Sequence, residues 1–166
     1  RYEVLELKPL VDYSVKYFKR KYKSHKFNIV YDISSEKIYL NVDKHRILQV
    51  FENLLTNSVK YSKGFSEVLI SCDNDDSKVN ICVSDNGVGM TEDQVARVFD
   101  KFYRADSSDT AVSGLGLGMS IVKQIVESHQ GQIWAESVKG EGTKVTFSLP
   151  IKSLGSKDQD SCGGLS

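Results

Sequence analysis

The order of helical and strand-like segments constrains the fold of this chain more than any other feature. Apolar residues recur at helical spacing in several segments, and between those segments they alternate with polar residues, as in half-buried strands. Helices are predicted at 8–23, 44–62, 92–99 and 119–128, and strands at 27–33, 37–42, 67–72, 78–84, 132–137 and 143–149. This order favours an α+β domain in which one mixed sheet carries its helices on a single face.

Short polar segments define the connections and the end of the domain. Residues 34–36 are few and polar, which predicts that the first two strands form a hairpin. Asp43 is a good N-cap for the helix at 44–62. Residues 153–166 are rich in Gly, Ser and Asp and contain few apolar side chains. We therefore expect one domain over residues 1–152, followed by a flexible C-terminal tail over 153–166.

Charge and cysteine content narrow the class of protein. Lys and Arg (22) balance Asp and Glu (22), so bulk attraction to nucleic acid or an anionic membrane is not expected. No run is long and apolar enough to span a bilayer, and no signal peptide opens the chain. The cysteines lack C-x-x-C spacing, which favours a reducing, cytoplasmic setting. The first residues already read as structured sequence, so we expect a cytoplasmic domain of a longer parent protein.

Residues 85–90, with the sequence DNGVGM, follow the predicted strand at 78–84 directly. A carboxylate at the mouth of a strand needs hydrogen-bond donors, and the amino edge of a purine supplies them. Gly87 and Gly89 would leave room for a flat ring and allow a tight turn. The tripeptide D-N-G is also an ordinary turn, and the hexapeptide alone does not distinguish the two interpretations.

The helix at 44–62 carries a polar stripe formed by Asn53, Asn57, Lys60 and Tyr61, which fall within an arc of about 100°. Such a stripe is ordinarily the solvated face of a helix. Asn, however, is a poor helix former that gains nothing on a solvated face. An Asn carbonyl oxygen can ligate Mg²⁺, and a Lys one turn further along could reach a phosphate group.

A glycine-rich run, GLGLG, occupies residues 114–118. Its backbone N–H groups, together with the start of the helix near Leu117, could bind an anion. The Rossmann interpretation fails because no strand precedes the run, and no Walker P-loop sequence occurs. The polar segment before it, with the lid predicted at 101–115, could close over a ligand. Arg104 is then placed to meet a terminal phosphate, although a surface arginine is the simpler interpretation of any single Arg.

Five motifs in order resemble the conserved boxes of sensor histidine kinases, which belong to the Bergerat-fold (GHKL) ATPases together with gyrase and MutL. The motifs are FENLLTNSVKYS (51–62), DNGVGM (85–90), VFDKFYR (98–104), GLGLGMSIVKQIVESHQGQIW (114–134) and GEGTKVTFSLP (140–150). The resemblance covers residues 1 to about 152, and the ordered set is far more specific than any one motif. It implies a two-layer α/β sandwich with a mixed, mostly antiparallel sheet, about three helices on one face and an ATP lid.

The resemblance also implies roles for individual residues. Asp85 would bind the adenine amino group, Asn57 would hold Mg²⁺ beside Asn53, and ATP or ADP would lie between the helix and the lid. Lys60 and Tyr61 would contact phosphate and ribose. The remaining nucleotide contacts implied are Gly87, Gly89, Met90, Phe102, Arg104 (to the γ-phosphate), Gly114, Gly116, Leu117, Gly118 and Thr143.

One departure from the hydrolysing branches of the superfamily predicts the reaction. In those branches a Glu one turn before the metal-binding Asn activates water, whereas this chain has Asn53, which cannot act as a general base. Glu52 is adjacent but points about 100° round the helix. The resemblance therefore implies transfer of the γ-phosphoryl group to a histidine. His25, His45 and His129 lack the H-[ED]-x-x-x-P pattern of an acceptor, so that histidine is expected on a separate domain.

The expected partners follow from this function. They are the dimerisation and phosphoacceptor domain of the parent kinase and a response regulator downstream, with no nucleic acid. The isolated domain is expected to be a monomer and the parent a homodimer. Three alternatives stay open: a serine kinase of the anti-sigma type, a non-catalytic nucleotide-binding module and a gyrase-type ATPase. The sequence leaves open the input signal and whether the parent is anchored in a membrane.

Overall fold

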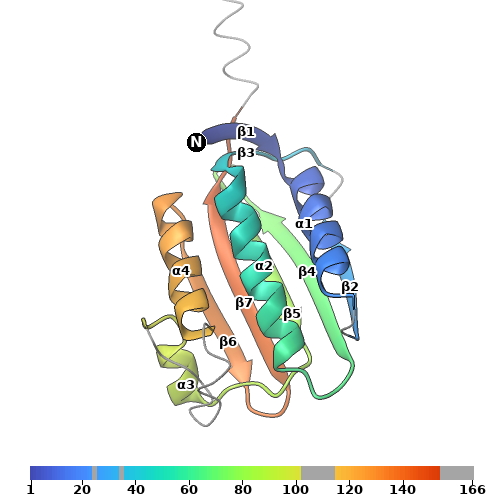
Figure 1. Ribbon diagram of the computed structural model, residues 1–166. Helices are drawn as coiled ribbons and strands as arrows, with labels where there is room; N and C mark the ends of the chain where they lie inside the picture. Colours follow the sequence, from blue (N-terminus) through green and yellow to red (C-terminus); the bar gives the residue numbers. More distant parts are fainter. Residues whose placement is uncertain (24–25, 34–35, 102–114, 154–166) are drawn as a thin grey trace, which may run out of the picture.

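A computed structural model describes residues 1–23, 26–33, 36–101 and 115–153 as one layered domain (Figure 1). Its helices and strands alternate much as the sequence predicts. The elements are β1 (Tyr2–Glu6), α1 (Leu7–Lys21), β2 (Phe27–Asp32), β3 (Tyr39–Asp43), α2 (Lys44–Lys60), β4 (Ser66–Asn74), β5 (Lys78–Asp85), α3 (Glu92–Arg97), α4 (Leu115–Ser128), β6 (Ile133–Val138) and β7 (Gly142–Pro150).

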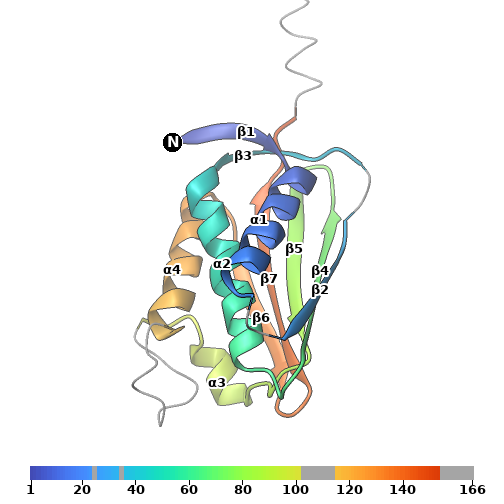
Figure 2. The ribbon, with the colours of Figure 1, turned by 45° about the vertical axis from the view of Figure 1, so that its right-hand side comes forward.

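The main sheet has five strands in the order β2-β4-β5-β7-β6. β2 is parallel to β4, and the other neighbours are antiparallel. The long helices α1, α2 and α4 all cover the same face, and the turned view separates the helical layer from the sheet (Figure 2). The predicted two-layer fold, a mostly antiparallel sheet with about three helices on one face, is confirmed.

The predicted hairpin between the strands at 27–33 and 37–42 is wrong. β2 instead pairs in parallel with β4, from Phe27 opposite Ser66 to Asp32 opposite Ser71. β3 pairs with β1, a strand that the sequence pattern did not predict, in a separate two-stranded sheet. The short connection at 34–36 favoured a hairpin because it brings two strands close in sequence. Which strands pair depends, however, on contacts with the rest of the fold, which a local pattern does not contain.

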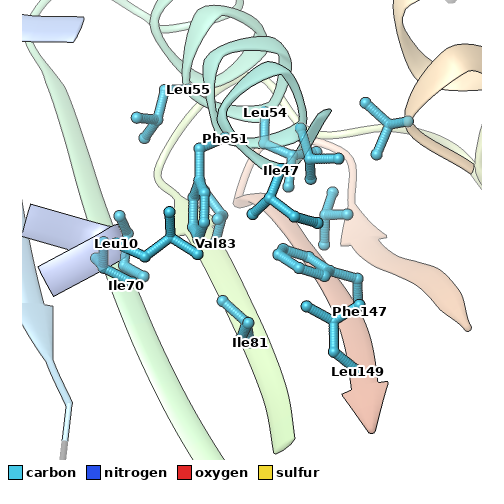
Figure 3. Close-up of a cluster of buried hydrophobic side chains, with 14 of the residues drawn as sticks. Leu10, Ile47, Phe51, Leu54, Leu55, Ile70, Ile81, Val83, Phe147 and Leu149 are labelled. Carbon is cyan, nitrogen blue, oxygen red and sulfur yellow. The ribbon is translucent and has the colours of Figure 1, made fainter. Parts of the chain in front are cut away.

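The core forms between α2 and the central strands. Spacing of three and four residues places Ile47, Phe51 and Leu54 on one side of α2, where they are almost completely buried. This side packs on alternate residues of β5 and β7 (Figure 3). The rings of Phe51 and Phe147 meet edge to face with their centroids 5.7 Å apart. Asp43 caps α2 as predicted, because its side chain accepts a hydrogen bond from the backbone N–H of Arg46.

The opposite face of the sheet is covered by none of the described helices (Figure 2). On this face the side chains of Leu69 in β4 and Trp134 in β6 remain 42% and 38% exposed, whereas Phe147 on the helical face is fully buried. Across the described ranges, no helix combines the length and the apolarity that crossing a bilayer requires.

Replacing Phe147 with alanine is expected to lower the free energy of unfolding by about 3–5 kcal/mol, because it opens a cavity beneath α2. The matched change Leu69→Ala on the open face should cost less than about 1 kcal/mol. Urea unfolding followed by circular dichroism measures both values. Equal costs for the two substitutions would contradict the placement of the core on one face.

Candidate functional site

Asp85 lies at the end of β5, between the backbones of two other segments. Its Oδ1 accepts hydrogen bonds from the backbone N–H of Gly87 at 2.9 Å and of Thr143 at 3.2 Å. Thr143 is also its partner in the pairing of β5 with β7. Burial raises the pKa of the Asp85 carboxyl, and hydrogen bonds from Gly87, Ser58 and Thr143 oppose that rise. The structure therefore brings Asp85 and Thr143 together, as the sequence predicts.

The two glycines of residues 85–90 are required by close backbone contacts. A Cβ atom on Gly87 would lie 2.6 Å from the carbonyl oxygen of Tyr61, and one on Gly89 would lie 2.1 Å from that of Val138. Gly89 also has a φ of +70°, in the left-handed region. The N–H of Val88 donates to the Tyr61 carbonyl at 2.9 Å. These contacts join the loop at 86–90 to the end of α2 on one side and to β6 on the other.

The polar stripe of α2 runs from the start of α4 to this loop. Asn53, half-buried, donates from Nδ2 to the carbonyl oxygen of Gly118 at 3.3 Å. Tyr61, the C-cap residue of α2, contacts the loop through its carbonyl. Asn57 and Lys60 lie between these two points on the same helix, and both are half-buried. The stripe is thus a boundary between two predicted motifs rather than a fully solvated face.

Glu52 is turned away from the stripe, as the helical spacing predicts. Its Oε2 accepts hydrogen bonds from Lys21 Nζ at 2.6 Å and from the Tyr22 hydroxyl at 3.3 Å, both at the end of α1. The hydrogen bond with Glu52 raises the pKa of Lys21. The carboxylate nearest to Asn53 in sequence is therefore held on the other side of the helix.

Two of the three histidines fall within the described residues. His129 is buried, and its Nε2 accepts from the backbone N–H of Asp43 at 3.1 Å. Its Nδ1 lies 2.8 Å from the carbonyl oxygen of Ile125, so both ring nitrogens bind within the fold. His45 is exposed in the first turn of α2. His129 is thus a structural residue and His45 a surface residue, and His25 lies outside the described residues.

Several predicted site residues receive no structural description. Phe102, Arg104 and Gly114 lie outside the described residues, as do the predicted lid at 101–115 apart from its two ends and the tail at 153–166 apart from Ser153. Gly116 and Leu117 belong to the first turn of α4, which begins at Leu115 rather than at 119 as predicted. The prediction began too late because glycine is a poor helix former.

Ser137 is one residue of this region that the sequence prediction missed. Its Oγ accepts from the backbone N–H of Met90 at 2.7 Å and donates to the carbonyl oxygen of Gly142 at 2.7 Å. The Thr143 hydroxyl lies 3.0 Å away. Ser137 could have been found from the hairpin of the last two strands, since the register places it opposite Thr143.

The substitution Asp85→Asn tests the cost of burying this carboxyl. Asn keeps an oxygen that can accept from Gly87 and Thr143 but carries no charge to desolvate. Because the pKa of Asp85 is raised in the folded state, ionised Asp85 destabilises the fold at pH 7. The variant should be at least as stable as the wild type at pH 7. Its advantage should shrink as the pH falls through the raised pKa toward the ordinary value for Asp.

Urea unfolding at pH 7 and at successively lower pH measures this difference. A variant that is clearly less stable than the wild type at pH 7, with the deficit disappearing in acid, would show that the ionised carboxylate stabilises the fold. That result would contradict the balance between burial and hydrogen bonding described above.

Comparison with known sequences identifies the family. The model of a family described as "Histidine kinase-, DNA gyrase B-, and HSP90-like ATPase" matches residues 42–153, more than half of the chain. The sensor protein kinase WalK of Staphylococcus haemolyticus is 40% identical over 134 residues, which are 79% of this chain and 22% of that relative. The chain therefore spans less than a quarter of the length of this curated relative.

Solved structures agree in fold. The catalytic domain of the histidine kinase ThkA gives a TM-score of 0.76 at 24% identity and covers 90% of this chain and 95% of that one. The structure of ThkA in complex with the response regulator protein TrrA gives a TM-score of 0.74 at 22% identity. It covers 91% of this chain and 42% of that one. The structure of full-length ShkA in complex with AMPPNP gives a TM-score of 0.79 at 23% identity. It covers 92% of this chain and 32% of that one. The chain thus belongs to the family of histidine kinase-, DNA gyrase B- and HSP90-like ATPases, and its fold is that of a histidine kinase catalytic domain.

Proposed function

We propose that this domain binds Mg²⁺-ATP and transfers the γ-phosphoryl group to a histidine on a separate dimerisation and phosphoacceptor domain of its parent. The observation that carries the proposal is the position of Asn53. An amide that cannot deprotonate water stands on the polar side of α2, while Glu52 is engaged by Lys21 on the other side. The 40% identity to a sensor kinase supports the same conclusion.

Asp85 is proposed to recognise adenine. Its Oδ1 accepts from Gly87 and Thr143, and Ser58 also donates to the carboxyl; since a carboxylate offers about four lone-pair positions, it can still accept from a ligand. An ionised carboxylate only accepts hydrogen bonds, and the 6-amino group of adenine donates them. The chemistry of this strand end therefore suits an adenine nucleotide, ATP or ADP. The similar kinase ShkA was solved in complex with AMPPNP, which supports this assignment.

The α2 stripe is proposed to hold the phosphates and the metal ion. Asn57, next to Asn53 on one side of the helix, offers the hard oxygen that suits an ion which keeps several waters and bridges phosphates. Bound Mg²⁺ would neutralise part of the phosphate charge. Lys60 would contact the phosphates and Tyr61 the ribose. Arg104 would assist at the γ-phosphate and Gly116 would support the loop around it.

Transfer requires a nucleophile other than water. As the bond from the γ-phosphorus to the bridging oxygen of ADP breaks, a bond to an imidazole nitrogen forms. His129 cannot supply that nitrogen without breaking its contacts with Asp43 and Ile125. His45 and His25 lack the acceptor pattern, so the acceptor is proposed to lie outside residues 1–152, on a homodimeric parent, and the isolated domain is proposed to be a monomer. A response regulator is proposed to receive the phosphoryl group from that histidine, by analogy with ThkA in complex with the response regulator TrrA.

The direct test combines this domain with a matching acceptor domain and γ-labelled ATP. Acid-labile phosphohistidine is expected on the acceptor, and Asn57→Ala should reduce labelling by at least about 100-fold, because the metal bridge to the phosphates is lost. Glu52→Gln serves as the matched control on α2 and should label normally. Acid-stable phosphoserine would instead favour a kinase of the anti-sigma type.

Replacing Asn53 with Glu should introduce the missing base. A positioned general base contributes roughly 100-fold or more, so phosphate release by the isolated domain should rise by at least about tenfold. Asn53→Gln, of the same length but without a base, should leave release at the wild-type level. Steady phosphate release by the unmodified domain, unchanged by Asn53→Glu, would support a gyrase-type ATPase and overturn the proposed transfer.

A further inference from the structure

The hydroxyl of Ser137 joins the two segments that flank Asp85. Ser137 lies on β6, half-buried, opposite Thr143 on β7. Its Oγ lies 2.7 Å from the backbone nitrogen of Met90, at the end of the loop at 86–90. It also lies 2.7 Å from the carbonyl oxygen of Gly142 and 3.0 Å from Oγ1 of Thr143. One side chain thus connects three backbone or side-chain groups around the predicted adenine site.

The protons in this cluster can be assigned by counting donors. The backbone N–H of Met90 donates to Ser137. Ser137 has a single hydroxyl proton, and it must lie toward Gly142, because two oxygens 2.7 Å apart repel each other unless a proton lies between them. The contact with Thr143 then requires the Thr143 hydroxyl to donate to Ser137. The proton of Thr143 is committed, so toward any further group its hydroxyl can only accept a hydrogen bond.

With this assignment of protons, the side chains of Asp85 and Thr143 can both only accept hydrogen bonds from a ligand. Ionised Asp85 can only accept, and Thr143 Oγ1 is restricted to accepting. A 6-amino purine presents a donor to this edge, either directly or through a water that donates to both protein oxygens. At the position of that amino group a 6-oxo purine presents a carbonyl acceptor, which would leave lone pairs facing one another there, and such a mismatch is costly.

We infer that Ser137 is a positioning residue that orients the Thr143 hydroxyl and thereby favours adenine over 6-oxo purine nucleotides. The inference rests on the proposed nucleotide site at Asp85. It extends that proposal by assigning a specificity role to a side chain that need not contact the nucleotide.

The test compares the affinities of wild type and Ser137→Ala for ATP and for inosine triphosphate, each with Mg²⁺, by calorimetry. Loss of Ser137 frees the Thr143 proton to turn toward the site. We expect ATP to bind roughly tenfold more weakly and the preference for ATP over inosine triphosphate to fall at least about threefold. Ser137→Thr, which keeps the hydroxyl, should restore both. Ser71→Ala on the open face of β4 is the matched control and should change neither.

A second pair of variants separates positioning from a general loosening of the fold. If Ser137 acts through Thr143, then Ser137→Ala introduced into Thr143→Val should leave the nucleotide preference unchanged. Where Ser137→Ala fails to fold by circular dichroism, Ser137→Cys, with only weak hydrogen-bonding capacity, should show the same reduced preference. An unaltered preference in a folded variant would overturn this inference alone. Failure of the wild type to bind ATP would overturn the proposed nucleotide site as well.

Discussion

The geometry of this site depends on one half-buried carboxylate that accepts hydrogen bonds from two backbone N–H groups. Asp85 receives hydrogen bonds from Gly87 and Thr143, and this arrangement requires the pairing of β5 with β7 in the observed register. The close approach of Gly87 to the Tyr61 carbonyl then joins the same point to the end of α2. The core beneath α2, with Phe51 against Phe147, fixes that helix relative to the strands. The carboxylate is thereby presented on a rigid frame.

The arrangement of β5 and α2 places different proposed functions on different elements. In the proposed function, Asp85 would select the base, whereas Asn53 and Asn57 on α2 would determine what is done with the phosphates. Helical spacing turns Glu52 away from the polar stripe, and its hydrogen bonds with Lys21 and Tyr22 join α2 to the end of α1 on that other side.

Local patterns predicted most of the elements, and long-range pairing limited the rest. The spacing of Ile47, Phe51 and Leu54 predicted the buried side of α2, because helical geometry is set within a few residues. The end of β5 at Asp85 was likewise predicted from neighbouring residues alone. The pairing of β2 with β4 was missed, because the residue pattern of a strand does not indicate which other strand it pairs with. Ser137 escaped notice for the same reason, since its role exists only once β6 and β7 are placed in register.

The most direct measurement is a calorimetric titration of Mg²⁺-ATP into the wild-type domain and into Asp85→Asn. The variant keeps the acceptor for Gly87 and Thr143, so it isolates recognition of the ligand from support of the fold. One ATP is expected to bind the wild type, and the folded variant should bind at least about tenfold more weakly, because a hydrogen bond to a charged group is lost. Equal binding by the two proteins, or no binding by the wild type, would contradict adenine recognition at Asp85.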